Sequence, residues 1–399
     1  MYRVETTVNP EEYDAFVSGH VLHSLLQSYH WYEVKQEWNH CHFLIYRHNT
    51  IVGAGLLLYR EIGKIFRIGY IPRGPILDYT DKPLVEFTMK SITQLAVQHQ
   101  LDTVIFDPKM VYQYKNKKSS IVNDDILKIK AHLESLSIKH IGFTKYMNDT
   151  IQPRHEAVIS LEQPLEHTVF SSTKQIIRRS LKKHITIVEH DASRLRDFDH
   201  ILRGVEKRHG IKLRNIQYFR RLLECYAMHA HLSFAEIDVC ATREKVIDRL
   251  EDLNAQKQLL VSSPKRIKLM EDEEKMLHSY LSELNSVHEK KIVLACNLSI
   301  GYADTYEMLY GGVSEQLKST HAQYALDYAV LEYAQKLGYK KVSMGGISEH
   351  EHDGLRRYKS QFGAITEEYI GEFHIINNHL KYALFSTLRK LLAYIKADK

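Results

Sequence analysis

Residues 50 to 79, TIVGAGLLLYREIGKIFRIGYIPRGPILDY, contain two β-rich runs that are separated by a short polar turn. Such a pair of runs predicts an antiparallel hairpin. A helical pattern follows, in which the apolar positions are Val85, Met89, Ile92 and Ala96. The next apolar run, Val104 to Phe106, has the pattern of a buried strand. Because a sheet must cover its apolar side, this order predicts an α+β unit with a helix on one face of the sheet.

The second half of the chain repeats this order. KIVLACNLSIG (residues 291–301) and DTYEMLYGG (304–312) resemble strands, and KKVSMGG (340–346) follows a helical pattern. The apolar positions of that helix are Leu326, Val330, Tyr333 and Leu337. We therefore predict an internal duplication; the alternative is that strands and helices occur in this order by chance. The predicted lobes are residues 1–152, and 153–241 together with 291–399, joined by a linker near 148–158.

Residues 242 to 290 belong to neither repeat. Two narrow apolar stripes run through them, and SSPK, residues 262–265, separates the two. The first stripe is Val246, Leu250, Leu253 and Leu260, and the second is Met270, Leu277, Leu281 and Leu284. This pattern predicts an antiparallel, coiled-coil-like helical hairpin that projects from the second lobe. The hairpin is either a structural or dimerisation arm, or a surface that binds a partner.

The composition is that of a folded globular protein. The chain has 399 residues, of which 44% are hydrophobic and 26% charged, enough for two domains. Lys and Arg exceed Asp and Glu by only 54 to 49, so a local basic face is possible but uniform nucleic-acid coating is not expected. The 4 cysteines form no CxxC pair, which is typical of a reducing compartment. Without a signal-like N-terminus or an apolar run of membrane-spanning length, we expect a cytoplasmic protein.

Two basic segments are candidate phosphate-binding sites. STKQIIRRSLKKH, residues 172–184, places five cations along one side of a predicted helix: Lys174, Arg178, Arg179, Lys182 and Lys183. A solvated helix face is the alternative. EKRHGIKLRNIQYF, residues 206–219, gathers further cations with Tyr218 around Gly210, which is expected to end a helix. Such a loop suits a pyrophosphate or a sugar phosphate.

Other familiar site patterns are missing or incomplete. HCH at residues 40–42 and HEHD at 350–353 lack a third and fourth ligand at recognised spacing, so no metal site is expected. The sequence also lacks GxxxxGK[ST], GxSxG and a strand-linked GxGxxG. Nucleotide hydrolysis, serine hydrolysis and dinucleotide chemistry therefore have no supporting signature.

Nine segments, taken in order, resemble the FemABX family of tRNA-dependent aminoacyl transferases. They are LLQSYHWYEVKQEW, YIPRGPILDY, IFDP, DTIQPR, RHGIKLRNIQYF, LYGG, MGGI, GLRRYKSQFG and YIGEF, and they extend along nearly the whole chain. The first two are most similar to streptococcal branching enzymes that start the interpeptide bridge. The resemblance implies two acetyltransferase-like (GNAT) lobes. It also implies transfer of an amino acid, serine or alanine, from charged tRNA to the stem-peptide lysine amine of lipid II or UDP-MurNAc-pentapeptide.

The resemblance also implies roles for individual residues. Lys35, Arg214, Tyr218 and Tyr310 match positions that bind the acceptor. Tyr358 and Lys359 match the aromatic and lysine pair near the reacting ester, and Asp107 matches a carboxylate near the acceptor peptide. A fixed lysine ammonium stabilises the oxyanion of the transition state, an effect of about 3 kcal/mol for one donor. The base that deprotonates the amine is either Asp107 or a group of the substrate.

Partners follow from the same resemblance. Aminoacyl-tRNA serves as a co-substrate, no cofactor is expected, and the basic helix and the hairpin are the candidate tRNA contacts. The C-terminal segment KYALFSTLRKLLAYIKADK, residues 381–399, is basic and amphipathic, and either rests on an anionic membrane or packs as an ordinary helix. A monomer is expected.

Two alternative functions remain. One is an acyl-CoA-dependent N-acyltransferase, which the glycine-free EQLKSTHAQYAL (315–326) disfavours; the other is a non-catalytic RNA-binding protein.

Overall fold

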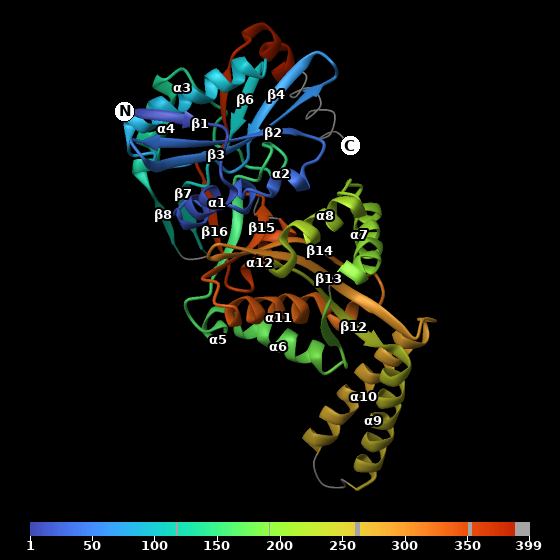
Figure 1. Ribbon diagram of the computed structural model, residues 1–399. Coiled ribbons are helices and arrows are strands. Elements are labelled where there is room, and N and C mark those ends of the chain that lie inside the picture. Colours follow the sequence, from blue (N-terminus) through green and yellow to red (C-terminus); the bar gives the residue numbers. More distant parts are fainter. Residues whose placement is uncertain (117–118, 191, 260–263, 350–352, 388–399) are drawn as a thin grey trace. The chain divides into compact units, whose positions relative to one another are not determined.

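The computed structural model describes residues 1–116, 119–190, 192–259, 264–349 and 353–387 (Figure 1). The chain forms two compact units. Unit 1 contains Met1–Glu162, Gly301–Glu307 and Tyr339–Lys399, and unit 2 contains Gln163–Ile300 and Met308–Gly338. The mixture of sheets and helices in both units confirms the predicted α+β class.

The first sheet of unit 1 is built around the predicted hairpin. Its strands lie in the order β1-β2-β3-β4-β6-β17-β9, and β5 pairs with β3. The strands are β1 (Tyr2–Glu5), β2 (Asn39–Arg47), β3 (Thr50–Ile62), β4 (Phe66–Ile71), β5 (Ile76–Leu77), β6 (Thr103–Phe106), β9 (Lys139–His140) and β17 (Phe373–Ile376). Strands β3 and β4 are antiparallel, and Gly63 and Lys64 in the turn between them both have positive φ, as tight hairpin turns require.

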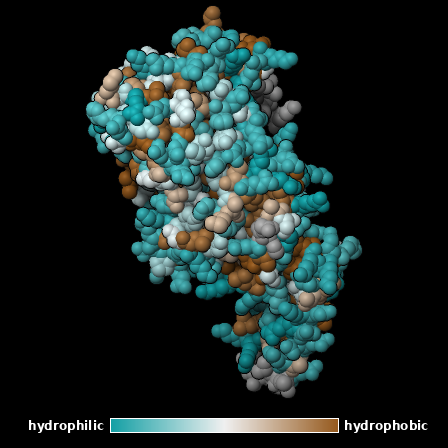
Figure 2. Space-filling view, viewed as in Figure 1, coloured by the Kyte–Doolittle hydropathy of each residue, from teal (hydrophilic) through white to brown (hydrophobic). Residues whose placement is uncertain are grey.

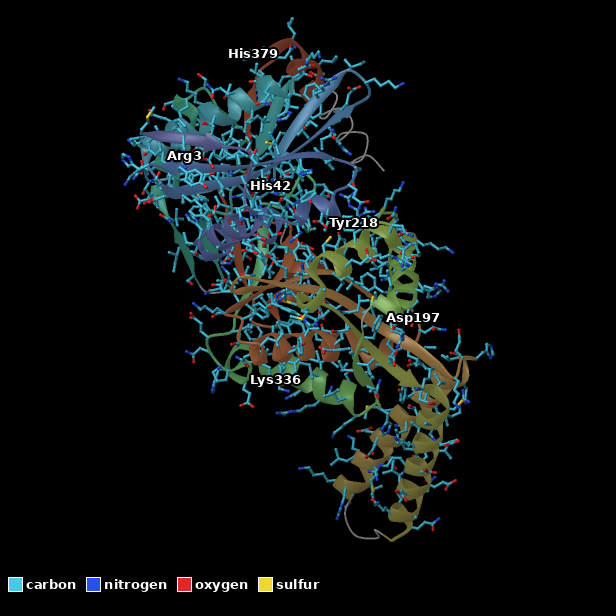
Figure 3. All side chains as sticks on the ribbon, in the orientation of Figure 1. Arg3, His42, Asp197, Tyr218, Lys336 and His379 are labelled. Atoms are coloured by element: carbon cyan, nitrogen blue, oxygen red, sulfur yellow. The ribbon has the colours of Figure 1, made fainter. Side chains whose placement is uncertain are left out.

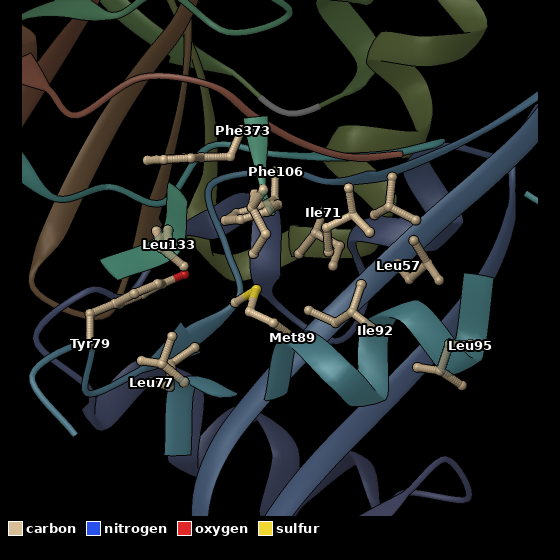
Figure 4. Packing of buried hydrophobic residues seen from close by; sticks show 14 of the residues in the cluster. Leu57, Ile71, Leu77, Tyr79, Met89, Ile92, Leu95, Phe106, Leu133 and Phe373 are labelled. Carbon is tan, nitrogen blue, oxygen red and sulfur yellow. The ribbon is translucent and has the colours of Figure 1, made fainter. Parts of the chain in front are cut away.

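Helix α3 (Lys82–Gln98) connects β4 to β6, and these two strands pair in parallel. The helix begins at Asp81, whose side chain accepts a hydrogen bond from the Leu84 amide, and a proline follows in the first turn. All four predicted core positions of this helix are buried: Val85, Met89, Ile92 and Ala96. They pack with Leu57, Ile71, Phe106 and Phe373 in the main core of unit 1 (Figure 4). The remaining helices of this region are α1 (Pro10–Gly19), α2 (Trp31–Val34) and α4 (Asp124–Ser135).

Unit 1 contains a second group of strands, one of which leads into the helix that carries Tyr358 and Lys359. Strand β15 (Lys341–Ile347) pairs with β10 (His155–Ser160), β10 with β16 (Ile365–Tyr369), β16 with β7 (Val111–Lys115), and β7 with β8 (Ser120–Val122). The first residues of β14 (Thr305–Val313) pair in parallel with β15. Helix α12 (Gly354–Ser360) follows β15. The order β13, β14, α11, β15 therefore repeats the order β3, β4, α3, β6, as the duplication predicts.

Unit 2 contains the antiparallel strands β11 (Thr186–His190), β12 (Ala230–Asp238) and most of β13 (Lys291–Tyr302). Helices α6 (Ser171–Leu181) and α11 (Ala322–Lys336) pack on each other, and α11 also lies against β12. The other helices are α5 (Leu165–Thr168), α7 (Leu195–His209) and α8 (Ile216–Tyr226). Leu326 and Val330 of α11 are buried as predicted, whereas Leu337 lies just beyond the helix and is 49% exposed.

The predicted helical hairpin is present as a pair of helices. Helices α9 (Val239–Leu259) and α10 (Pro264–Asn285) lie side by side (Figure 1), and α10 begins at the proline of SSPK. Val246, Leu250 and Leu253 of the first stripe are buried. In the second stripe Met270 and Leu284 are buried, while Leu277 and Leu281 are partly exposed. Leu260 lies outside the described residues. The outer surface of this pair is mainly hydrophilic in the space-filling view (Figure 2).

The two compact units do not follow the predicted lobe boundaries. Residues 339–399 were assigned to the second lobe, but they belong to unit 1. The physical reason is strand pairing: β17 lies beside β6, with Phe373 opposite Phe106, and β16 pairs with β7. The C-terminal part of the chain is thus tied to N-terminal strands by backbone hydrogen bonds that local sequence patterns do not reveal.

Candidate active site

Asp107 occupies the C-terminal end of β6, where the buried run Val104–Phe106 ends. Its carboxylate is itself buried and accepts a hydrogen bond of 2.8 Å from the Arg73 backbone amide. The Tyr70 hydroxyl lies 3.1 and 3.2 Å from the two carboxylate oxygens. These contacts hold the carboxylate in one orientation at the edge of the first sheet.

Arg73 is the residue around which this region is organised. It lies in the turn after β4 with a φ of +54°, a left-handed conformation that is unusual for arginine and that surrounding contacts must stabilise. Its buried guanidinium donates to Glu156 Oε1 at 2.6 Å and to the Pro153 carbonyl at 2.7 Å. The guanidinium also lies 4.7 Å from the centre of the Tyr369 ring. Arg73 was assigned no role from the sequence, although an arginine between prolines in an otherwise apolar turn was a possible signal.

The network continues from Glu156 to Lys109. Lys109 Nζ lies 3.7 Å from Glu156 Oε2 and 3.2 Å from Glu307 Oε1. The Tyr369 hydroxyl lies 3.1 Å from Glu156 Oε2 and 3.0 Å from Glu367 Oε2. Periodicity could not detect this network, because its members come from distant segments of the chain.

The environment gives different pKa values to Asp107 and Glu156, the two carboxyl groups that contact Arg73. Burial raises the pKa of Asp107 to about 7, although Arg73 lowers it in part. Burial also raises the pKa of Glu156, but Lys109 and Arg73 together outweigh that effect and hold it at about 2. Glu156 is therefore a permanent anion that fixes the two cations, whereas Asp107 exchanges a proton near neutral pH. A group that titrates near the working pH is suited to general base catalysis.

Lys359 and Tyr358 lie on α12, whose first turn is capped by Asp353. Lys359 is half-buried, and its ammonium donates to the Gly346 carbonyl at 2.8 Å. The Tyr358 ring packs edge-on against Phe362, with 5.4 Å between the ring centres. Lys359 is thus held against β15 and does not extend from a solvated helix face.

Lys359 and Asp107 are connected through a short series of contacts within unit 1. Gly346 lies opposite Glu156 in the β10–β15 pairing. It also packs so closely on Pro153 that a Cβ at position 346 would come within 2.5 Å of the Pro153 ring. The Pro153 carbonyl accepts the hydrogen bond from Arg73, which in turn holds Asp107. Asp107, Tyr358 and Lys359, the three predicted catalytic residues, therefore lie in one unit. Lys359 is connected to Asp107 through Gly346, Pro153 and Arg73.

Three of the four predicted acceptor-binding residues meet in unit 2. Tyr218 is in the first turn of α8 (Figure 3). Asn215 caps this helix, and its side-chain oxygen accepts a hydrogen bond from the Tyr218 backbone amide. The Arg214 guanidinium lies 5.1 Å from the centre of the Tyr218 ring, and the Tyr218 and Tyr310 rings are 6.1 Å apart. Burial raises the pKa of Tyr310, and hydrogen bonds from Tyr218 and Arg214 oppose that rise. We call these three residues the aromatic platform; it consists of an exposed guanidinium beside the buried Tyr218 ring and the partly buried Tyr310 ring.

The fourth residue, Lys35, belongs to unit 1 and follows α2. Its backbone amide donates to the Tyr32 carbonyl at 3.0 Å, and its Nζ lies 5.2 Å from the Trp31 ring centre. Gly210 ends α7 in a left-handed conformation, as predicted. Arg208, in the last turn of α7, pairs with Glu315, whereas Arg214 lies against the Tyr218 ring.

The five cations of the predicted tRNA-binding stripe have different surroundings. Arg178, Arg179 and Lys182 are exposed. Lys174 donates to the Glu166 carbonyl at 2.8 Å, and Lys183 donates to the Ser319 carbonyl at 2.6 Å. Helix α6 ends at Leu181, so Lys183 lies beyond the predicted helical face. The stripe is therefore divided between three solvated cations and two that make contacts within unit 2.

The histidine-rich segments do not form a metal centre in the part of the chain that the structure describes. Within the described ranges, no group of three or more His, Cys, Asp and Glu side chains is arranged to hold a metal ion. His42 stacks on Tyr29 and His40 on Tyr32, which accounts for the HCH segment. Residues 350–352 of HEHD lie outside the described residues. None of the helices in the described part of the chain combines the length and apolar character needed to cross a membrane.

Comparisons with known proteins extend over almost the entire chain. The FemAB family model matches residues 8–390. The lipid II:glycine glycyltransferase of Staphylococcus aureus is 25% identical over an alignment that covers 98% of this chain and 96% of that protein. The same coverage and identity are found for the protein of that name from S. aureus strain USA300. The crystal structure of FemX has a TM-score of 0.76 and 23% identity, and the match covers 96% of this chain and 99% of that one.

These matches confirm the family resemblance of the nine motifs, and the FemX likeness supports the mixed α+β fold. The similarity to the streptococcal subgroup stays a prediction. The family assignment also decides the class of activity. The chain belongs to the FemAB family and is a tRNA-dependent aminoacyltransferase of the peptidoglycan-branching type.

Proposed function

We propose that this enzyme transfers one amino acid from aminoacyl-tRNA to an amine on the stem peptide of lipid II and thereby builds an interpeptide bridge. The observation that carries this proposal is the similarity, over 98% of the chain, to a lipid II:glycine glycyltransferase. The finer prediction is that serine or alanine is donated to the lysine side chain, as in the streptococcal enzymes. UDP-MurNAc-pentapeptide is the soluble form of the acceptor.

In the proposed mechanism, unit 1 supplies the groups that react. The acceptor amine attacks the ester carbonyl of aminoacyl-tRNA, a C–N bond forms, and the C–O bond to the terminal ribose breaks. Asp107, whose pKa burial raises to about 7, accepts the proton that the attacking amine loses and passes it to the ribose oxygen, which leaves as a hydroxyl. Lys359 stabilises the negative charge on the carbonyl oxygen, and its hydrogen bond to Gly346 orients the ammonium. Tyr358 provides an aromatic surface beside the ester.

We propose that Lys35, Arg214, Tyr218 and Tyr310 bind the sugar-pyrophosphate part of the acceptor. Clustering of the last three in unit 2 supports this role. The guanidinium offers several donors for phosphate oxygens, and the tyrosines offer rings and hydroxyls for a sugar. Each of these contacts forms in the ground state, so their contribution is expected in acceptor affinity.

For tRNA we propose the basic stripe on α6 and the helical hairpin as contacts. Exposed Arg178, Arg179 and Lys182 are the residues of the stripe best placed to reach phosphates, with Lys174 and Lys183 beside them. Helices α9 and α10 act in this proposal as a coiled-coil arm of residues 242–290, inserted in the second of two GNAT-like lobes. Ion pairs between the helices, such as Arg249 with Glu273 at 2.9 Å, support a stable pair.

The proposed place of action is the cytoplasm, at the inner face of the membrane that holds lipid II. In the described part of the C-terminal segment, Tyr382 is buried and Phe385 stacks on Phe66. Leu380 and Leu384 are exposed, which is consistent with a peripheral lipid contact. The basic residues after position 387 lie outside the described residues.

A donor panel tests the proposed function. The enzyme is incubated with lipid II or UDP-MurNAc-pentapeptide and with seryl-, alanyl- or glycyl-tRNA, and the stem peptide is weighed by mass spectrometry. We expect one donor to add a single residue. Absence of any product with all three donors and both acceptors would overturn the proposal, and product formed from acetyl-CoA without tRNA would favour the N-acyltransferase alternative.

A further inference from the structure

Unit 1 contains a cavity of about 610 Å³ next to the Arg73 network. Most of its wall is apolar and comes from the segment after α1, the end of β5 and helix α4; representative residues are Leu22, Leu77, Ile126 and Ile129. Lys109, Lys341 and Glu367 form part of the same wall. The volume lies in the range of small-ligand sites.

Glu367 occupies a central position on β16. It pairs with Glu156 of β10 on one side and with Tyr114 of β7 on the other. Glu156 in turn lies opposite Gly346, whose carbonyl accepts the hydrogen bond from Lys359. One strand, β10, thus lies between Glu367 on β16 and Gly346 on β15, the residue that orients Lys359.

The carboxylate of Glu367 lacks a close cation. Among the described residues no lysine, arginine or histidine forms an ion pair with it, because Lys109 pairs with Glu156 and Glu307, and Lys341 lies 3.9 Å from Asp304. Its contact is the Tyr369 hydroxyl at 3.0 Å. Burial raises the pKa of Glu367 despite the more distant lysines. A carboxylate in a mainly apolar wall is stabilised when a cation joins it.

The charges of the surrounding network lead to the same conclusion. Arg73, Lys109 and Lys341 are the cations of this region, and they are outnumbered by the carboxylates of Asp107, Glu156, Glu307 and Glu367. One additional positive charge would improve the balance. A ligand that suits this cavity has an apolar part for the wall and a positive charge for Glu367. An ammonium on an alkyl chain has both.

We propose that Glu367 is an acceptor-binding residue that holds the ammonium of the nucleophilic amine, and that the cavity receives the aliphatic chain that bears it. This inference rests on the proposed function, in which the acceptor is an amine. Glu367 binds the protonated amine before the reaction, and the proton transfer remains with Asp107. The proposal gives unit 1 an aminoalkyl pocket for the acceptor.

The test measures binding as well as turnover. Calorimetry gives the Kd of UDP-MurNAc-pentapeptide and of the same molecule acetylated on its lysine amine, for the wild type and for Glu367→Gln. We expect the substitution to weaken binding of the free amine about tenfold and to leave the acetylated compound unchanged, as for loss of one charge-assisted hydrogen bond. Asp78→Asn is the control, because Asp78 is an exposed carboxylate on the same wall.

Equal binding of the two compounds by the wild type, or a Glu367→Gln value within twofold of the wild type, would overturn the proposal. Ile129→Trp, which occupies the cavity without changing a charge, supplies a second variant and should weaken binding of the free amine. If the wild type binds the free amine selectively but transfers no amino acid, the pocket stands and the proposed function fails. If transfer occurs but Glu367→Gln binds normally, the function stands and the pocket fails.

Discussion

The ionic network of unit 1 and the aromatic platform of unit 2 use similar residue types in opposite ways. Arg73 is buried among carboxylates, and Arg214 is exposed over a tyrosine ring. Burial moves the pKa of Asp107 towards neutrality, which prepares it for proton transfer. In the platform the guanidinium of Arg214 is instead exposed, and in the proposed function it donates to an anionic ligand. Burial, which a sequence motif does not encode, thus gives the two arginines different environments.

The largest effect is expected from Arg73→Met. The substitution leaves Asp107 and Glu156 buried without the guanidinium, so the free energy of unfolding should fall by about 3 to 5 kcal/mol. Urea denaturation measures the change. Arg67→Met is the control, because Arg67 and Glu61 form an exposed pair at 3.4 Å, for which about 0 to 1 kcal/mol is expected. Equal decreases in the two variants would show that the network does not stabilise unit 1.

Lys359→Met should reduce kcat by about a hundredfold, since one donor to an oxyanion contributes about 3 kcal/mol. The acceptor KM should change little. Steady-state kinetics with both substrates separate the two parameters. Arg357→Met, on the exposed side of the same helix, should behave as the wild type. A Lys359→Met enzyme with normal kcat would remove Lys359 from the reaction.

The pH dependence of kcat should reflect Asp107. The pKa of this carboxyl is raised to about 7, so the protonated form predominates below that value and cannot accept a proton. Below pH 7, kcat should therefore fall about tenfold for each pH unit, and it should level off above. In Asp107→Asn most of the activity should be lost, and the remaining kcat should no longer fall below pH 7. An unchanged fall in the variant would assign the base to another group.

The same shift predicts how stability changes with pH. Because the folded-state pKa of Asp107 is higher than its ordinary value of 3.8, the native state retains a proton that the unfolded chain releases. Asp107 therefore contributes less to stability as pH rises from about 4 to 7. Thermal unfolding of Asp107→Asn should show a weaker dependence on pH over this interval than the wild type.

Arg214→Ala should raise the acceptor KM about tenfold with little change in kcat, as expected when a charge-assisted interaction made before the reaction is removed. Arg220→Ala is the matched control, because Arg220 is exposed on α8, the helix that Arg214 precedes. If kcat falls and KM does not rise, Arg214 takes part in the chemical step. The proposed difference between Arg214, which binds, and Lys359 and Asp107, which react, would then be wrong.

The smallest effect is expected for the basic stripe. Replacing Arg178 and Arg179 by alanine should weaken aminoacyl-tRNA binding and lower the dependence of log Kd on log salt by about one unit for each tRNA phosphate that is no longer neutralised. Filter binding over a salt series measures this slope. Lys128→Ala with Lys130→Ala, on α4 of unit 1, is the control. An identical slope in wild type and stripe variant would place the tRNA elsewhere.

Local patterns predicted the parts of this molecule that depend on neighbours in sequence. The hairpin of β3 and β4, the buried face of α3 and the end of α7 at Gly210 follow from periodicity and turn chemistry. The position of Asp107 after a buried strand was visible for the same reason. Family resemblance then supplied roles that composition could not.

Long-range pairing could not be predicted from the sequence. Nothing in the residues of β17 indicates that Phe373 lies opposite Phe106, and the predicted lobes therefore differ from the compact units. The Arg73 network is another example, since Arg73, Glu156 and Glu307 are charged residues whose burial results only from the assembled strands. The sequence pattern places Lys183 on the basic, phosphate-binding stripe, but its hydrogen bond to Ser319 depends on a segment far along the chain.

One measurement tests most directly whether Lys359 acts in the reaction and Arg214 in acceptor binding. The Kd of UDP-MurNAc-pentapeptide is determined by calorimetry for Lys359→Met and Arg214→Ala, and is compared with the turnover of each variant. We predict that Lys359→Met binds the acceptor as tightly as the wild type while turnover is lost, and that Arg214→Ala loses affinity and retains turnover at saturating acceptor. A Lys359→Met variant whose affinity falls in proportion to its turnover would contradict this division.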